Sequence, residues 1–399
     1  MTAIERRPKR KQRAATKGRH PASSVKADGR GPRRPVGRRT PLFLILLVAV
    51  TSLVMLGVVM VLSASAVVSI NNSSSAWSLF RRQLLWVGVG SVAMLVMMRV
   101  DYRRLRALAA PAMATSCFAL LVVILPGLGE TRNGATRWLP VGPLSFQPSE
   151  FAKLALILFI ADLLSRPGRP MSETRITVRP ALVVTSVVVG LLMIQPHLGA
   201  ILVIGVTTGT MMFIAGAPMR HMLGVAGSGI ALAGVMVVAT PWRLARLLAF
   251  RDPWADPTNA GYQSLQSLHA ITVGGVSGVG LGGSRAKWGF LPEAHTDFIF
   301  DIVAEELGLI GAATVLLIFT VITVAGVVAS LRAPDRFGML LALGITMWIV
   351  AQAVFNLGAV MSLLPVMGVT LPFLSFGGSS LVVTMAGVGI LLNVARQGR

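Results

Sequence analysis

Acidic residues about three quarters of the way along the chain form, together with one histidine, its densest group of side chains able to do chemistry. They begin in the segment Leu291–Asp297 and continue into the apolar stretch that follows: Glu293, His295, Asp297, Asp301, Glu305 and Glu306. Carboxylates in so apolar a context are costly to bury and mark a functional site. A positioned carboxylate can act as a general base, and basic groups beside it can bind phosphate.

The spacing of these acids favours a helix. Asp297, Asp301 and Glu305 recur every four residues, which predicts one acidic helical face. Asp297 alone could instead be an N-terminal capping residue, worth about 1 kcal/mol, but that role does not explain the two deeper acids. We expect His295 to be a hydrogen-bond partner rather than a metal ligand, because no second histidine lies within helical reach.

Three further motifs carry polar residues into apolar sequence. Glu150 and Lys153 lie three residues apart in the first turns of an expected helix, where they either pair or face a ligand. The serine-rich segment Leu371–Ser380 precedes the last apolar run, where small residues permit close helix packing. Gly278–Gly283 fits G-x-G-x-x-G, but no hydrophobic strand precedes it, so we reject a dinucleotide site and expect close backbone approach.

The elements that position these residues are predicted to span a membrane. The chain has 399 residues, of which 54% are hydrophobic and only 13% charged, against about 25% charged in soluble domains. The sequence therefore predicts an all-α polytopic membrane protein with about ten transmembrane helices. The apolar runs cover residues 42–67, 84–100, 107–128, 148–164, 181–194, 200–217, 222–240, 298–331, 339–360 and 373–394.

The charge distribution sets the expected orientation. Basic residues follow every even-numbered run, which predicts cytoplasmic termini and places the long loop 241–297, between helices 7 and 8, outside the cell. Residues 1–40 hold fourteen basic and two acidic residues, and we expect a disordered cytoplasmic tail that touches anionic lipids rather than nucleic acid. Residues 41–399 are expected to form the membrane domain. Cys117 is alone, so no disulfide is expected.

In its motifs and their order, the chain resembles the SEDS family of peptidoglycan polymerases from about Leu42 to Arg396. Phe80–Gln83, Asp101-Tyr102 and Asp252–Pro257 favour its division branch over its elongation branch. The motifs that carry the family resemblance are Gln147–Glu150, Gly261–Gln263, Gly278–Gly282, Leu291–Phe300, Glu305–Gly308, Leu371–Phe373 and Ser375–Ser380.

The resemblance implies a glycosyltransferase of the inner membrane at the division septum. Family members polymerise lipid II with inversion and release undecaprenyl diphosphate, and their essential aspartate falls on Asp297. It also implies a class B penicillin-binding transpeptidase and other division membrane proteins as partners. Two alternatives stay open, a lipid II flippase and a non-catalytic scaffold that activates a transpeptidase.

The proposed chemistry requires positive charge at the diphosphate, from side chains or from a divalent cation such as Mg²⁺ or Mn²⁺, and no organic cofactor. Two positions depart from the family pattern. His197 replaces an aspartate, and Asp301 replaces a small residue below the proposed base. Beside the catalytic candidate Asp297, the expected substrate-binding residues are Glu150, Lys153, Arg246, Lys287, Glu293, His295, Ser375 and Ser379.

Overall fold

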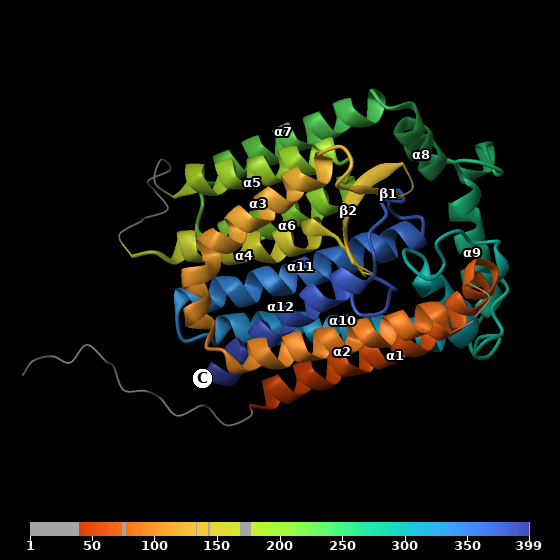
Figure 1. Cartoon of the computed structure of the whole chain (residues 1–399), viewed down its shortest axis with the longest axis horizontal. Coiled ribbons are helices and arrows are strands. Elements are labelled where there is room, and N and C mark those ends of the chain that lie inside the picture. The colour runs from red at the N-terminus through yellow and green to blue at the C-terminus, as the bar shows by residue number, and fades with distance from the viewer. Residues whose placement is uncertain (1–39, 74–76, 133, 143, 168–176, 399) are drawn as a thin grey trace, which may run out of the picture. The chain divides into compact units, whose positions relative to one another are not determined.

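The computed structural model describes residues 40–73, 77–132, 134–142, 144–167 and 177–398 (Figure 1). The predicted basic tail therefore lies outside the described residues, except for Thr40. The side-chain hydroxyl of Thr40 donates to the carbonyl of Ala395, 3.1 Å away, which links the start of the first helix to the end of the last.

Each predicted apolar run overlaps a helix of the described chain. Seven helices or helix pairs are long and apolar enough to cross a membrane: α1, α2, η1 with α3, α6, α10, α11 and α12. The long helices are α1 (Pro41–Ser73), α2 (Ser78–Arg99), α3 (Ala109–Ile124) after η1 (Tyr102–Leu108), α4 (Pro148–Ser165), α5 (Val178–Ile194), α6 (Leu198–Ala215), α7 (Met219–Val238), α10 (Ile299–Leu331), α11 (Arg336–Val360) and α12 (Gly378–Gln397).

Helices α11 and α12 form the centre of the bundle. Of the most apolar 18-residue stretch of α12, 83% is buried. The corresponding share in α2 is 17%, although both helices are apolar. α12 packs against α2, α11 and α10, and α11 also packs against α4 and α6 (Figure 1). A helix that is apolar yet largely exposed is typical of one that faces lipid, so α2 marks the outer surface of the bundle.

A small sheet between α3 and α4 corrects the all-α prediction. Strands β1 (Glu130–Arg132), β2 (Ala135–Val141) and β3 (Leu144–Phe146) form an antiparallel sheet in that order. β1 and β3 have 3 residues each, too few for a periodic signal, and the 7 residues of β2 do not alternate between polar and apolar. The dipeptide Asn133-Gly134 was nevertheless a hairpin signature, and Gly134 has a φ of +74°.

The long segment after α7 also contains helices. It includes α8 (Pro241–Arg251), η2 (Pro253–Ala255), α9 (Tyr262–Gly274) and η3 (Ala286–Trp288). α9 packs along α10, and the close approach is allowed by Gly274, where an added Cβ would lie 2.0 Å from the carbonyl oxygen of Ala304. This packing anchors the segment to the bundle.

Helix α10 is interrupted at Gly308, which has φ 66° and ψ −162°. The backbone of residues 275–280 fills the gap: Val279 N donates to Glu305 O at 3.0 Å and Leu309 N donates to Gly275 O at 2.9 Å. A Cβ on Gly278 would lie 2.1 Å from the Glu306 carbonyl oxygen. The prediction of close backbone approach is confirmed for Gly278 and Gly283, whereas Gly280 and Gly282 have no described atom within 4 Å of an added Cβ.

Candidate active site

Asp297 lies in the turn before α10, where several distant segments meet. Its side chain is half-buried. Asn356 of α11 donates from Nδ2 to the backbone carbonyl of Asp297 at 2.7 Å and to that of Val369 at 2.6 Å. A Cβ placed on Gly368, whose φ is +68°, would lie 3.5 Å from Oδ2 of Asp297. Asn356 thus fixes the backbone of Asp297, and a glycine leaves room beside its carboxylate.

Burial and, to a smaller extent, the nearby Glu293 raise the pKa of Asp297 to about 7, against the lowering effects of Arg246 and Arg137. A carboxyl group that titrates near neutrality can accept a proton at physiological pH and release it again. A pKa shifted by burial together with specific charged partners is characteristic of functional sites. Asp297 therefore has the properties of a general base.

Two arginines bring positive charge to this carboxylate. Arg246 lies on α8, and its pKa is lowered by burial and raised by Asp297. Arg137 lies on β2 and donates from Nε to the Gln195 carbonyl at 3.1 Å and from Nη2 to the Pro196 carbonyl. Nothing in the sequence predicts this role of Arg137, because its approach to Asp297 depends on the unpredicted sheet.

His197 lies in the turn that Arg137 contacts. It is buried, and its Nδ1 has no hydrogen-bond partner among the residues that the structure describes. Burial and the neighbouring charges of Arg137 and Lys153 lower its pKa well below the usual value. The imidazole is therefore neutral at pH 7, and it adds no charge of either sign to this cluster.

Glu293 and His295 lie in the turns between η3 and α10. Oε2 of Glu293 accepts a hydrogen bond from the Thr296 hydroxyl at 2.7 Å. The ring of His295 packs on that of Phe376, with centroids 5.8 Å apart, and its carbonyl accepts from Phe376 N at 2.9 Å. Burial lowers the pKa of His295, against the opposing effect of Glu293. Glu293 thus lies close enough to Asp297 to interact with it electrostatically, and His295 connects this turn to the 361–377 loop.

Glu150 and Lys153 form a buried ion pair, Nζ to Oε1 2.8 Å, so the pairing alternative is confirmed. Lys153 also donates to Oε1 of Gln352 at 2.7 Å, and Gln352 donates to the carbonyl of Thr370 at 3.1 Å. The Ser380 hydroxyl donates to Oε2 of Glu150 at 2.9 Å. This network joins α4, α11 and α12 to the loop that carries Gly368.

The two serine candidates accept hydrogen bonds from backbone amides. Ser375 Oγ accepts from Leu371 N at 2.8 Å, and Ser379 Oγ accepts from Gln147 N at 3.2 Å. Both are buried. They shape the 361–377 loop and its contact with the start of α4.

Lys287 belongs to a separate buried network at the α10 interruption. Its Nζ lies 3.1 Å from Oε1 of Glu306 and donates to the Gly282 carbonyl at 2.7 Å and the Ser63 hydroxyl at 3.0 Å. All three ammonium protons therefore have protein acceptors. The structure gives Lys287 an internal role in fixing the loop before η3.

The predicted acidic face does not form. Asp297 precedes the helix, whose N-cap is Phe298 without a side-chain cap, so the capping alternative is wrong as well. Glu305 accepts from the hydroxyl of Ser284 at 2.5 Å and from the amide of Arg285 at 2.8 Å, so it caps the loop. Asp301 is fully buried and lies close to Ser267 and Glu305. Three acids at one spacing thus have three different environments.

The residues described by the structure contain no group of three or more histidine, cysteine, aspartate or glutamate side chains arranged to bind a metal. Asp297 and Glu293 interact electrostatically and offer two carboxylates. Mg²⁺ is commonly bound by one or two carboxylates together with substrate phosphates and water. These two residues fit that limited role.

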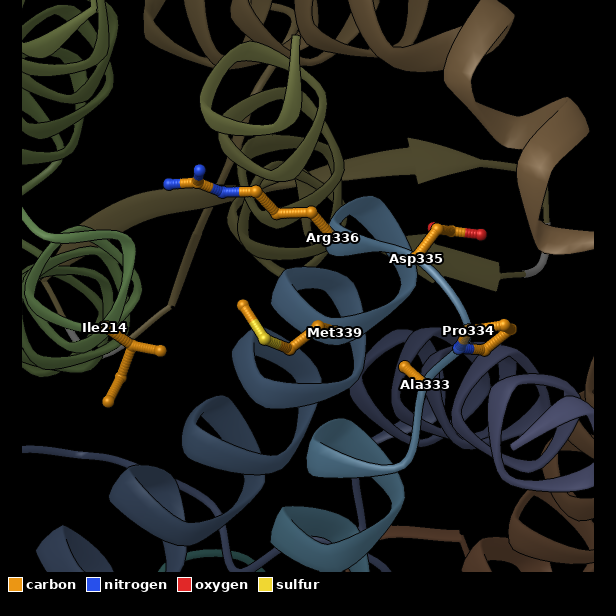
Figure 2. A pocket seen from close by; sticks show the side chains of 6 residues that line it. All are labelled: Ile214, Ala333, Pro334, Asp335, Arg336 and Met339. Atoms are coloured by element: carbon orange, nitrogen blue, oxygen red, sulfur yellow. The ribbon is translucent and has the colours of Figure 1, made fainter. Parts of the chain in front are cut away.

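A narrow cavity of about 10 Å³ lies beside Asp297, lined also by Phe355, Asn356 and Gly368. This volume is close to the minimum for one water molecule. A wider cavity, about 520 Å³, lies at the other end of α10 and α11, between Ile214 and the turn that holds Asp335 and Arg336 (Figure 2). The wider cavity is thus remote from the proposed base.

Comparison with known proteins places this architecture in a family. The model for the FtsW/RodA/SpoVE family of cell cycle proteins matches residues 44–399. The chain belongs to this family. Stage V sporulation protein E of Bacillus subtilis is 42% identical over 89% of the chain and 97% of its own length. A probable peptidoglycan glycosyltransferase FtsW of Geobacter metallireducens is 40% identical over 89% and 94%.

Solved FtsW/RodA/SpoVE structures share the fold. A chain of a structure described as "Structural coordination of polymerization and crosslinking by a peptidoglycan synthase complex" matches with a TM-score of 0.73 and 33% identity, over 88% of this chain and 96% of that one. Rod shape determining protein RodA of Thermus thermophilus matches with a TM-score of 0.65 and 32% identity, over 88% and 95%. The family match begins after the basic tail.

Proposed function

We propose that this chain is a peptidoglycan glycosyltransferase that polymerises lipid II, with Asp297 as its general base. One observation carries the proposal: a half-buried carboxyl group whose pKa is about 7 lies within electrostatic reach of Arg246 and Arg137. The names of the relatives, several of which are probable peptidoglycan glycosyltransferases, support the same chemistry.

In the proposed reaction, the carboxylate of Asp297 removes the proton of the acceptor sugar's 4-hydroxyl as its oxygen attacks the donor's anomeric carbon. The bond from that carbon to the diphosphate oxygen breaks, and configuration inverts. Proton removal by a positioned base contributes about 10²–10⁴ in rate. The diphosphate leaves with the bonding electron pair, and Arg246 and Arg137 stabilise its added negative charge.

The other candidate residues take two kinds of role in this proposal. Glu293 and His295 border the base and are available to contact substrate. Glu150 and Lys153 are positioning residues that support the Gly368 loop through Gln352. Lys287, Ser375 and Ser379 are likewise positioning residues, because their contacts are to the protein itself. A divalent cation, if bound by Asp297 and Glu293, would add positive charge at the diphosphate.

The proposed setting is the inner membrane at the division septum, with ten spans, cytoplasmic termini and residues 241–297 outside. The apolar helices and the basic short loops support this topology. The proposed partner is a class B penicillin-binding transpeptidase among other division proteins. A structural relative comes from a complex that couples polymerisation with crosslinking, which supports that pairing. The basic tail is proposed to bind anionic lipid.

The test is glycan synthesis from lipid II by the purified full chain with its transpeptidase partner. Asp297→Asn is expected to abolish synthesis. Asp256→Asn is the matched control, because Asp256 lies in the same long loop and accepts from Ala260 N at 3.2 Å in a turn. Continued synthesis by folded Asp297→Asn protein would exclude the mechanism. Transbilayer movement of lipid II without synthesis would instead favour a flippase, and stimulation of the transpeptidase alone would favour a scaffold.

A further inference from the structure

Helix α8 has two different faces. Leu244, Leu247, Leu248 and Arg251 follow the i, i+3, i+4, i+7 pattern, so they share one side of the helix. Leu248 on this side is 61% exposed. The opposite side carries Ala249, which is buried, and Arg246, which interacts electrostatically with Asp297. One side of α8 thus faces the proposed base, and the other carries leucines, of which Leu247 and Leu248 are exposed and Leu244 is partly exposed.

The leucine face continues an apolar surface from the preceding helix. α7 ends at Val238, which is 68% exposed, and Ile230 and Val235 are also exposed. α8 begins at Pro241, so it starts where the apolar surface of α7 stops. Directly after α8, Trp254 is 74% exposed. Tryptophan is enriched where membrane meets water.

We propose that α8 and Trp254 lie in the headgroup layer of the outer leaflet, with the leucine face inserted toward the acyl chains. The inference rests on the topology proposed above, in which α7 crosses the membrane and ends outside. A helix with an apolar side and basic residues characteristically lies in the interface plane. Arg251, at the edge of the leucine face, can extend its guanidinium to lipid phosphates while its stem packs on apolar surface.

In this placement, the outer leaflet helps to position Arg246 at the active site. Because Arg246 projects from the side of α8 opposite the leucines, the depth of α8 in the leaflet sets the position of Arg246 relative to Asp297. A lipid-linked substrate carries its diphosphate in the same headgroup layer. The helix therefore aligns the cation with the substrate's charged group, and α8 acts as a positioning element.

The test is the depth of α8, measured independently of activity. A nitroxide label is attached at Leu248→Cys in full-length protein carrying Cys117→Ala, in nanodiscs of phosphatidylethanolamine and phosphatidylglycerol. We expect the label to collide more with oxygen, which concentrates in lipid, than with a water-soluble nickel complex. The control label at Thr258→Cys, an exposed position of the following loop, is expected to show the reverse preference.

Two results would overturn the proposal. One is a Leu248 label that prefers the nickel complex, which would place the helix in water. The other is a label that becomes shielded from both reagents only when the transpeptidase is added, which would make the face a protein interface. The glycan synthesis assay is separate, so an inactive but inserted helix would count against the proposed function alone.

A second variant tests the coupling. Leu247→Asn with Leu248→Asn changes exposed side chains, so the bundle should fold, as checked by thermal unfolding. We expect the turnover rate of glycan synthesis to fall by about the same factor as in Arg246→Gln, with the unfolding midpoint unchanged. For the depth measurement in this variant, the label is moved to Leu244→Cys on the same face of α8. An unchanged turnover rate in protein whose Leu244 label has left the lipid would show that α8 does not position Arg246.

Discussion

Replacing Arg246 by glutamine should move the acidic limb of the pH–rate profile of glycan synthesis to higher pH. The proposed base must be ionised to accept a proton, so activity is lost as pH falls through the pKa of Asp297, which is about 7. Arg246 lowers this pKa by favouring the carboxylate. Without that guanidinium, the same carboxyl group should hold its proton to a higher pH.

The size of the effect follows from the placement of the arginine. An opposite charge within about 4–6 Å lowers a carboxyl pKa by about 1–3, and the partial exposure of Arg246 favours the low end of that range. A pKa of about 8 would reduce the ionised fraction of Asp297 at pH 7 from about one half to about one tenth. The rate at pH 7 should therefore fall about fivefold, whereas at pH 9 ionisation costs almost nothing.

The assay is the initial rate of lipid II polymerisation between about pH 6 and 9, with Arg285→Gln as the control. Arg285 is exposed in the same long loop, and the contact that fixes it to Glu305 comes from its backbone amide. A lower rate of Arg246→Gln that persists at high pH would measure how much Arg246 separately stabilises the leaving diphosphate. An acidic limb that stays in place, or moves to lower pH, would refute the electrostatic reasoning.

Four further predictions concern this site and the network at the α10 interruption. Gly368→Ala should lower the turnover rate about tenfold, because a φ of +68° strains an alanine and shifts the loop that lies beside Asp297 Oδ2. Gly280→Ala is strained in the same way at φ +94°, but no described atom lies within 4 Å of the added Cβ, so it should cost stability without that loss of rate. Lys287→Met should destabilise the protein by about 3–5 kcal/mol in thermal unfolding by leaving buried Glu306 unpaired, and added Glu306→Gln should restore part of that. If a divalent cation stabilises the leaving diphosphate, EDTA should reduce the rate of synthesis and added Mg²⁺ or Mn²⁺ should restore it. An unchanged rate would mean that the arginines alone stabilise the diphosphate. Because the folded pKa of Asp297 is raised, wild-type stability should fall as pH rises from about 4 to 7, and Asp297→Asn should remove that slope from the unfolding midpoints.

The sequence by itself determined the long apolar helices and the motif that contains Asp297. Apolar runs of spanning length dictate helices in a bilayer, since every backbone polar group must be bonded within its own segment. The Glu150–Lys153 pair was also accessible, because residues three apart on a helix are neighbours. The motif Leu291–Asp297 identified the catalytic candidate before any packing was known.

Only the tertiary structure decided what surrounds that aspartate. Asn356 and Gly368 lie far along the chain from Asp297. Arg137 interacts electrostatically with Asp297 from β2 of the three-stranded sheet, whose sequence shows no alternating pattern. The equal spacing of Asp297, Asp301 and Glu305 predicted a shared helical face that does not form. α10 begins after Asp297, and the Glu305 carboxylate accepts a hydrogen bond from the loop amide of Arg285. Local spacing governs which residues share a helix, but burial and long-range contacts set the charge state of each carboxyl group.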